Sequence, residues 1–502
     1  MPVPAPNEVV AAPPPSVLRP WWREMEGYHW WVLMVAVLGW LFDGMDQRLF
    51  VLARTPAIRE LLPHLPEAQV TTYAGYATTL FILGWATGGL IFGMFGDRWG
   101  RTRTMMLTIL LYSMFTGLSA LSRSWWDFSL YRFLCGTGIG GEYAAGVALV
   151  AEVMPARARP YCLGMLQGLG ALGHVGGSLL SLGLGPQGEI HGLSGWRALF
   201  LVGIVPALLV VVIRLRLREP ESWLKAAREA KTDAAGAPDE FHRQLGDFRE
   251  IFKNKRLLFH TLIGMWLGIV GQIGQWGIGY WSPELIRGSA MEQRQRKFID
   301  TAPATSRQDS LKIRRLSPSE LAAASTAGRE EAGQLLKGWK AEDDALVGRG
   351  TMLQDIGGLL GTFAITAFAV SFGRRPAFAL AYLCSLGAAL LAFGCLHKPS
   401  DVYWMIPLLG FTVASIFGCF AIYFPELFPT RLRSTGTGIC YNGARFITAF
   451  GPLALGRLTQ LYAGLGYATP LRPAAITLSF VFLLGVLAVC FAPETRDKPL
   501  PE

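Results

Sequence analysis

Long, predominantly apolar segments recur along the 502 residues of this chain, and examples are Trp30–Ala53, Leu257–Tyr280 and Phe480–Ala492. A helix needs about 20 such residues to cross the hydrocarbon core of a membrane. Twelve crossings would therefore use roughly 240–250 residues, half of this chain. Only 16 % of the residues are charged, against about 25 % in an ordinary soluble domain. The pattern predicts an all-α polytopic membrane protein and excludes a soluble enzyme, a disordered chain and a disulfide scaffold.

We predict twelve transmembrane helices, with ends placed to within a few residues. They span residues 29–52, 72–95, 104–122, 128–152, 161–184, 196–217, 257–285, 351–371, 376–397, 402–424, 434–461 and 474–492.

The distribution of Lys and Arg predicts the orientation of these helices. If the N-terminus is cytoplasmic, the inner segments hold 24 Lys and Arg residues and the short outer loops hold five. Basic residues gather in cytoplasmic loops, so both termini are expected inside. The net charge of +10 is then a basic cytoplasmic face rather than a surface for nucleic acid. The expected location is a bacterial-type inner (plasma) membrane, with the lipid bilayer as the surrounding medium.

Two segments fall outside the predicted helices and the short loops. Residues 1–28 are rich in Pro and Ala and are expected to be a disordered cytoplasmic tail. Residues 287–349 carry twelve Lys and Arg yet fall on the outer side, and long loops translocate largely regardless of charge. We interpret this segment as an extra-cytoplasmic insertion that contains short solvated helices. The seven cysteines lie in apolar segments without metal-ligand spacing, so neither a metal nor another cofactor is expected.

An internal repeat divides the chain into two halves. The pattern E-x-x-P-x-R-x-R, followed by Gly, begins at Glu152 and recurs at Glu426, an offset of 274 residues. Gly100-Arg101 and Pro220-Glu221 also recur, at an offset of 273. Chance agreement at nearly one offset across three separate loops is not expected, so the repeat indicates two related halves. We expect two pseudo-symmetric six-helix halves at 29–217 and 257–492, a cytoplasmic linker at 218–256 and a cytoplasmic tail at 493–502.

The first helix of each half also matches, at an offset of 229. Asp43 and Asp46 of the first half correspond to Gln272 and Gln275 of the second half. One half therefore carries acids where the other carries amides.

These motifs together resemble those of the major facilitator superfamily. The segment Gly93–Arg103 is similar to its signature G-x-x-x-D-R-x-G-R-x-R. Other motifs resemble those of the sugar porters within this superfamily. They are the E-x-x-P-x-R-x-R loops, the segment Arg132–Glu142, and Pro-Glu-Ser and Pro-Glu-Thr at the ends of the two halves. Asp43-Gly-Met-Asp46 resembles the D-G-x-D of the aromatic-acid and metabolite:proton symporters. The resemblance covers all twelve helices and implies a transporter with a central cavity.

Differences between this sequence and the motifs of these families narrow the range of expected substrates. Sugar porters carry a Gln-Gln pair and an Asn in the seventh helix, where this chain has Val270, Gly271 and Trp276. The fifth helix lacks the Gly-Pro of drug:proton antiporters. An organic anion is therefore favoured over a sugar, and uptake over drug export.

Four charged residues near the middle of helices in the first half are candidates for proton coupling. Ionisable side chains are costly inside a membrane and usually mark a pathway. Asp43 and Asp46 share one face of the first helix, and Glu142 lies at a similar depth in the fourth helix. The family pattern places Arg132 opposite Asp46. The pair is either a proton switch, which we favour, or a permanent structural ion pair, and we expect Arg48 to offset Asp46 nearer the outer surface.

The candidate substrate ligands lie mainly in the second half. Arg445 falls near mid-depth of the eleventh helix, where an arginine either pairs with an acid or binds an anionic substrate. Its planar guanidinium matches a carboxylate with two parallel hydrogen bonds. Tyr441 and Asn442 precede it by one turn, and the amides Gln272 and Gln275 are either ligands or interhelical hydrogen-bonding groups.

Opposite charges at the predicted cytoplasmic helix ends suit ion pairs that close an inner gate. The alternative is that these basic residues serve only to fix the orientation of the chain. The candidates are Asp97, Arg98, Arg101, Glu152, Arg157, Glu426 and Arg431.

The function expected from the sequence is secondary active transport by a monomer, in which protons drive uptake of a small organic anion. The alternatives are sugar or polyol:proton symport, drug or metabolite export, and a membrane sensor that transports nothing. An enzyme is not expected, since no nucleotide-binding loop, nucleophile elbow or zinc-protease motif occurs in the chain.

Overall fold

The computed structural model describes residues 20–501, apart from 65–66, 186–188, 191, 209–212, 214–215, 234–244, 302–329 and 468. Seven continuous helical stretches in this part of the chain are long and apolar enough to span a membrane. The others are interrupted or more polar, yet each of the twelve predicted segments contains helix in its described residues. The predicted fold class is confirmed.

The first half is formed by six predicted crossings and a short hairpin. Its elements are η1 (Trp21–Glu24), α1 (Gly27–Leu61), α2 (Glu67–Trp99), α3 (Arg101–Ser119), α4 (Trp125–Val153), α5 (Arg159–Leu169), α6 (Ala171–Leu184), β1 (Glu189–Ile190), β2 (Leu193–Ser194) and α7 (Gly195–Val202). The linker to the second half contains α9 (Glu221–Asp233) and α11 (Phe248–Lys253).

The second half is more broken along its crossings. Its elements are α12 (Lys255–Gln272), η2 (Ile273–Ile278), η3 (Gly279–Trp281), α13 (Ser282–Thr301), α16 (Glu330–Phe372), α17 (Arg374–Cys395), α18 (Pro399–Glu426), η5 (Thr430–Leu432), α19 (Arg433–Gly438), η6 (Ile439–Gly443), α20 (Ala444–Thr448), α21 (Gly451–Gly464), α22 (Leu471–Ser479) and α23 (Val481–Phe491). The segments η2 and η6 are π-helical, and such bulges often occur at functional sites.

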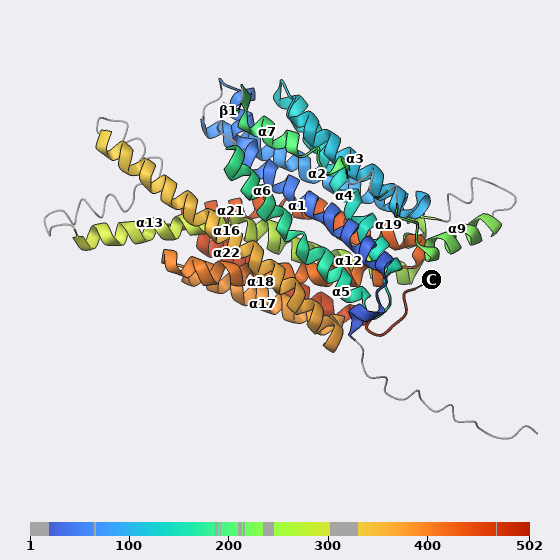
Figure 1. Ribbon diagram of the computed structural model, residues 1–502. Helices are drawn as coiled ribbons and strands as arrows, with labels where there is room; N and C mark the ends of the chain where they lie inside the picture. Colours follow the sequence, from blue (N-terminus) through green and yellow to red (C-terminus); the bar gives the residue numbers. More distant parts are fainter. Residues whose placement is uncertain are drawn as a thin grey trace, which may run out of the picture.

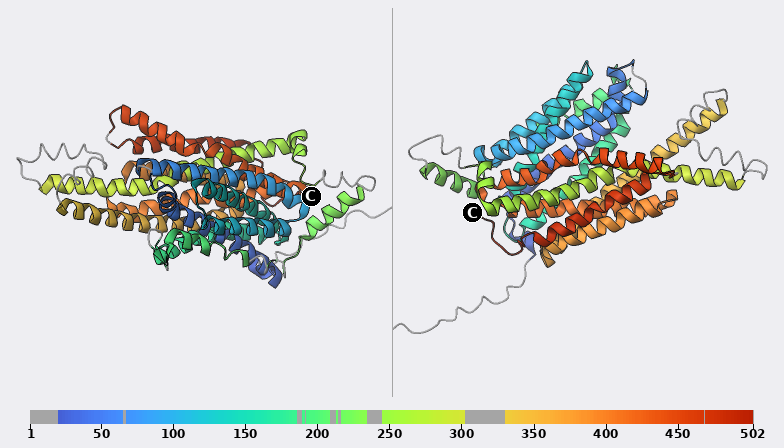
Figure 2. Two further views of the ribbon diagram at one scale, coloured as in Figure 1. Left: turned by 90° about the horizontal axis from the view of Figure 1, so that it is seen from above. Right: turned by 180° about the vertical axis from the view of Figure 1, so that it is seen from behind.

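The two halves lie side by side, and the C-terminus lies at one end of the bundle near α9 (Figure 1). We call this end the tail end, and the opposite end, near β1, α13 and the beginning of α16, the hairpin end. Figure 2 shows α13 and the first turns of α16 extending beyond the rest of the bundle.

The insertion differs from its prediction. Instead of separate short helices, its described residues continue two transmembrane helices, because α13 runs on to Thr301 and α16 begins at Glu330. Residues 302–329 lie outside the described part. The N-terminal tail also begins to fold earlier than expected, since η1 starts at Trp21 and α1 at Gly27. Its residues 1–19 lie outside the described part as well.

Glycines bring helices into backbone contact at matched positions of both halves. A Cβ atom at Gly84 or Gly88 of α2 would lie about 2 Å from a carbonyl oxygen of α4. The same holds for Gly357 and Gly361 of α16 against α18, 273 residues later. Without a hydrophobic driving force between helices in lipid, close packing of small residues is a main source of association. The repeat therefore extends from the loops into the packing of the two halves.

The loop signature Gly-Arg adopts one conformation in both halves. Gly100 and Gly373 have φ of +107° and +104°, a region that side chains other than that of glycine rarely enter. Each precedes a helix whose first N–H groups donate to a carboxylate, Glu219 in the first half and Glu494 in the second. The repeat matches Glu494 to Glu221, whereas the carboxylate that accepts these bonds in the first half belongs to Glu219, two residues earlier. Burial raises the pKa of Glu219, although the N–H groups of Thr102 and Arg103 act in the opposite direction.

Replacing Gly100 with alanine should destabilise the protein by about 2–3 kcal/mol, because the backbone strain adds to displacement of the Glu219 carboxylate. A Cβ atom at this position would lie 2.4 Å from Oε1 of Glu219. Thermal unfolding of the purified protein in detergent measures the loss. Gly75→Ala in α2 is the matched control, since a Cβ atom there meets nothing within 4 Å. Equal melting temperatures for the two variants would contradict the prediction.

Candidate functional site

A cavity of about 140 Å³ lies between the two halves. Its wall combines residues of α1, α2, α5 and α6 with residues of η2, α16, α18, η6 and α20. Because both halves contribute, any movement of one half against the other changes the shape of the cavity. The cavity wall contains three of the predicted substrate ligands: Gln275, Tyr441 and Arg445.

Arg445 is the most distinctive residue of this wall. Its side chain is buried, yet its Nε and Nη1 atoms have no hydrogen-bond partner among the described residues. No carboxylate of the described chain lies within ion-pair distance of it. Its guanidinium lies 3.5 Å from the ring centroid of Trp85 and 4.8 Å from that of Tyr441, so the rings supply cation–π contacts. A buried cation with free N–H groups is ready to bind an anion.

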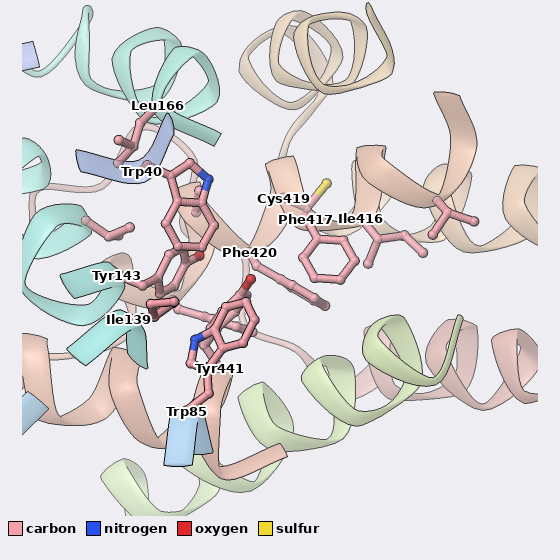
Figure 3. Packing of buried hydrophobic residues seen from close by; sticks show 14 of the residues in the cluster. Trp40, Trp85, Ile139, Tyr143, Leu166, Ile416, Phe417, Cys419, Phe420 and Tyr441 are labelled. Carbon is pink, nitrogen blue, oxygen red and sulfur yellow. The ribbon is translucent and has the colours of Figure 1, made fainter. Parts of the chain in front are cut away.

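Aromatic side chains of the two halves meet beside Arg445. The rings of Tyr143 and Tyr441 stack at a centroid distance of 3.9 Å, and Trp40 packs on Tyr143 at 4.9 Å. Figure 3 shows these rings together with Trp85 and Phe417. The arrangement gives the cavity flat apolar surfaces next to a positive charge.

The remaining predicted ligands make structural hydrogen bonds outside the cavity wall. The Nε2 of Gln272 donates to the carbonyl oxygen of Tyr441 at 2.5 Å, which fastens α12 to the π-helical turn η6. The Nδ2 of Asn442 donates to the carbonyl oxygen of Gly140 at 3.3 Å, between the halves. Both side chains are fully buried, so in this conformation they position η6 rather than line the cavity.

The expected contact between Asp46 and Arg132 is present inside the first half. Their Oδ2 and Nη1 atoms are 3.3 Å apart, and both side chains are buried. Thr116 donates to Oδ1 of Asp46 at 2.6 Å and accepts from Nη2 of Arg132 at 3.0 Å, while Ser119 accepts from Nε of Arg132. Thr116 and Ser119 of α3 thus complete a small polar network. Its role in proton coupling stays a prediction.

Asp43 and Glu142 form the other part of this buried polar cluster. Both are buried, and they interact electrostatically with each other. Apart from the contact between these two carboxyl groups, the oxygens of Asp43, Oε2 of Glu142 and the hydroxyl of Tyr112 nearby have no hydrogen-bond partner in the described structure. Of the three acids in this interior, only Asp46 is paired with an arginine. None of the four charged residues lines the cavity between the halves.

Arg48 does not offset Asp46, as the sequence suggested. Its Nη2 instead lies 2.6 Å from Oδ2 of Asp355, on α16 of the other half. Helix α1 faces the second half at this level, and the spacing of charges along one helix could not reveal an acid contributed by a distant segment. The predicted offset is therefore wrong.

A buried ionic network joins the halves at the tail end. Asp97 accepts hydrogen bonds from the backbone N–H groups of Ser434 and Thr435 at 3.2 and 2.8 Å, and pairs with Arg101 at 3.0 Å. Glu152 lies between Arg101 of its own half and Arg433 of the other, 2.9 Å from each. Three predicted gate residues thus come together around α19, and this end of the bundle is closed.

The other predicted gate residues lie around this network without joining it. Arg98 donates to the carbonyl oxygen of Leu245, Arg157 pairs with Glu24, and Arg431 pairs with Glu250 of the linker. Glu426 binds Arg374 at 2.8 Å within the second half, as Glu152 binds Arg101 in the first.

Several residues of these sites were not predicted. Arg433 and Arg374 belong to repeated motifs, so the repeat could have indicated them. Asp355 and Trp85 carry no local signal, because a single acid or tryptophan in an apolar helix does not reveal what it faces. The same is true of Tyr112, Thr116 and Ser119 on α3.

Comparison with known proteins places this geometry in a family. The profile of the Major Facilitator Superfamily matches residues 26–292, more than half of the chain. The cis,cis-muconate transport protein of Acinetobacter baylyi is 26 % identical over 487 residues, which cover 95 % of this chain and 98 % of that protein. The niacin transporter of the same organism is 27 % identical over 52 % of this chain and 60 % of its own length.

The fold also resembles a solved structure. The proton:xylose symporter XylE bound to 6-bromo-6-deoxy-D-glucose superposes with a TM-score of 0.64, at 18 % identity, over 94 % of this chain and 98 % of that one. The two halves of this chain therefore have the fold of a solved transporter. Together with the matching profile, this fold shows that the chain belongs to the Major Facilitator Superfamily and is a membrane transporter, not an enzyme.

Proposed function

We propose that the protein imports a small organic anion, and that this substrate is a carboxylate with an aromatic or otherwise flat group. The observation that carries this proposal is the buried guanidinium of Arg445, with two unpartnered N–H atoms at the cavity wall. A carboxylate would accept hydrogen bonds from it, while Trp40, Trp85 and Tyr441 of the cavity wall would pack on an adjoining planar group. The names of two relatives support the same class, since muconate and niacin are both carboxylic acids.

We further propose that protons drive this uptake through the polar cluster of the first half. Asp43, Asp46 and Glu142 carry up to three negative charges, and only Asp46 is paired with a cation, Arg132. Burying uncompensated charge is costly, so the cluster favours binding of protons. Protonation of Asp46 would release Arg132, and the resulting change in the packing of α1 on α4 would bias the two halves toward the other access state.

The proposed orientation places the tail end in the cytoplasm of a bacterial cell and the hairpin end outside. The excess of Lys and Arg in the segments of the tail end supports it. In this orientation the network of Asp97, Arg101, Glu152 and Arg433 is the closed inner gate. Its ion pairs would have to separate for substrate to leave into the cell, and one copy of the chain contains every part of this cycle.

Uptake by the purified protein in liposomes tests the proposal. Labelled benzoate, nicotinate, muconate and xylose would be offered with an acidic exterior, with and without a protonophore. We expect accumulation of at least one carboxylate that collapses when the protonophore is added. Protein-free liposomes correct for passive entry of the neutral acids. Accumulation of xylose and of no carboxylate would instead support the sugar symporter, for which the amide Gln275 in the cavity wall is the favourable feature.

A further inference from the structure

An ion pair joins the two halves at the hairpin-end rim of the cavity. Arg48 follows the cavity residue Gln47 along α1, and Asp355 is among the first cavity residues met along α16 from the hairpin end. Nη2 of Arg48 and Oδ2 of Asp355 are 2.6 Å apart. His174 of α6 also faces this pair, with its Nδ1 4.0 Å from Oδ1 of Asp355.

Each partner is fixed to its own half. A Cβ atom at Gly173 would lie 1.9 Å from the carbonyl oxygen of Leu41, and one at Gly177 would lie 2.9 Å from Cβ of Arg48, so α6 packs directly on α1. In the other half, a Cβ atom at Gly410 of α18 would lie 2.1 Å from the carbonyl oxygen of Gln354. Neither helix can move away from its neighbour without losing this packing. The ion pair must therefore break when the halves separate at this end.

We propose that Arg48 and Asp355 are the gate of the cavity at the hairpin end, opposite the network of Glu152. The pair closes over the cavity when the halves approach, and it opens when they separate. Its side chains are 19 % and 20 % exposed, whereas Arg101 and Glu152 are fully buried. A partly solvated pair is weaker than a buried network and separates at lower cost. The gate on this side is thus the more easily opened of the two.

The same pair also sets the charge of the cavity. Asp355 lines the wall that contains Arg445, and an uncompensated carboxylate there would repel an anionic substrate. Arg48 cancels this charge while the gate is closed over a bound substrate. Arg48 is therefore a specificity-determining residue for anions as well as a gate residue.

Labelling of a cysteine in the cavity tests the gate without any substrate. Ala171→Cys places a thiol in the cavity wall, and a membrane-impermeant maleimide is applied to intact cells and to inverted membrane vesicles. The protein without this cysteine gives the background from the native thiols. In the Arg48→Gln/Asp355→Asn variant we expect labelling of intact cells to be about three- to tenfold faster. The reversed pair, Arg48→Asp/Asp355→Arg, should label almost as slowly as the parent.

If the Arg48→Gln/Asp355→Asn variant labelled at the parental rate in intact cells, the proposal that this pair is a gate would be overturned. Size-exclusion chromatography of each variant checks folding, and the reversed pair keeps the test valid if the neutral variant unfolds. Faster labelling in inverted vesicles alone would overturn the assignment of this gate to the outer side.

The charge effect has a separate readout, which rests on the proposed anion substrate. Arg48→Gln alone should raise KM for the transported carboxylate about fivefold, and the added Asp355→Asn substitution should restore it. An unchanged KM in Arg48→Gln would exclude charge compensation by Arg48. Because the labelling test needs no substrate, the gate and the anion substrate can fail independently.

Discussion

Arg445→Gln is expected to lower kcat/KM for carboxylate uptake at least about 100-fold, because two hydrogen bonds to a charged group contribute roughly 1.5–3 kcal/mol each. The residue is buried, has unpartnered Nε and Nη1 atoms, and lies against the rings of Trp85 and Tyr441. Arg445→Lys should recover only part of the loss, since an ammonium group keeps the charge without the planar fork. Initial rates of labelled benzoate or nicotinate uptake into liposomes measure both variants.

The matched control is Arg457→Gln, which removes an exposed arginine from α21. It should transport at the parental rate. If Arg445→Lys transported normally, carboxylate binding by two parallel hydrogen bonds would be ruled out. If Arg445→Gln bound a carboxylate as tightly as the parent protein in a thermal-shift titration, the anion site would have to lie elsewhere in the cavity.

Asp46→Asn is expected to abolish accumulation driven by a pH gradient while leaving exchange of substrate across the membrane intact. Asparagine has nearly the shape of aspartate but cannot bind and release the proton, so Arg132 would lose its charged partner while keeping its hydrogen bonds to Ser119 and Thr116. Net uptake under an imposed gradient and exchange of labelled for unlabelled substrate at equal pH separate the two effects. The loss should be nearly complete for net uptake and less than about threefold for exchange.

Asp344→Asn, on the exposed beginning of α16, is the control and should retain net uptake. A permanent ion pair between α1 and α4 predicts a different result for Asp46→Asn. In that case the variant would still accumulate substrate against the gradient, although it would melt at a lower temperature. Retained uphill uptake would therefore refute the proton switch.

The sequence predicted the parts of this protein that follow from one-dimensional patterns. The number of crossings follows from apolar length, because each helix must satisfy its own backbone hydrogen bonds in lipid. The division into halves follows from the repeated loop motifs, which build equivalent turns at Gly100 and Gly373. Resemblance to the family supplied the contact between Asp46 and Arg132, which the structure contains.

Errors arose where a residue had to be assigned a partner across the bundle. Arg48 lies two residues after Asp46, yet it pairs with Asp355, 307 positions away. Gln272 and Gln275 occupy matched positions of one motif, but only Gln275 reaches the cavity wall, since Gln272 binds the carbonyl oxygen of Tyr441. The insertion was expected to hold separate short helices, whereas its described residues continue α13 and α16 beyond the bundle. The part of this prediction that falls on residues 302–329 lies outside the described residues.

By itself, the sequence determined the membrane fold, the two halves and the set of charged residues inside them. The tertiary structure alone decided how those charges are compensated: Asp46 and Glu152 have partners, Asp355 is held by Arg48, and Arg445 faces the cavity without a carboxylate. The physical reason is that burial makes each charge costly at a known place along a helix, but the rotation and tilt of the helices decide which groups meet.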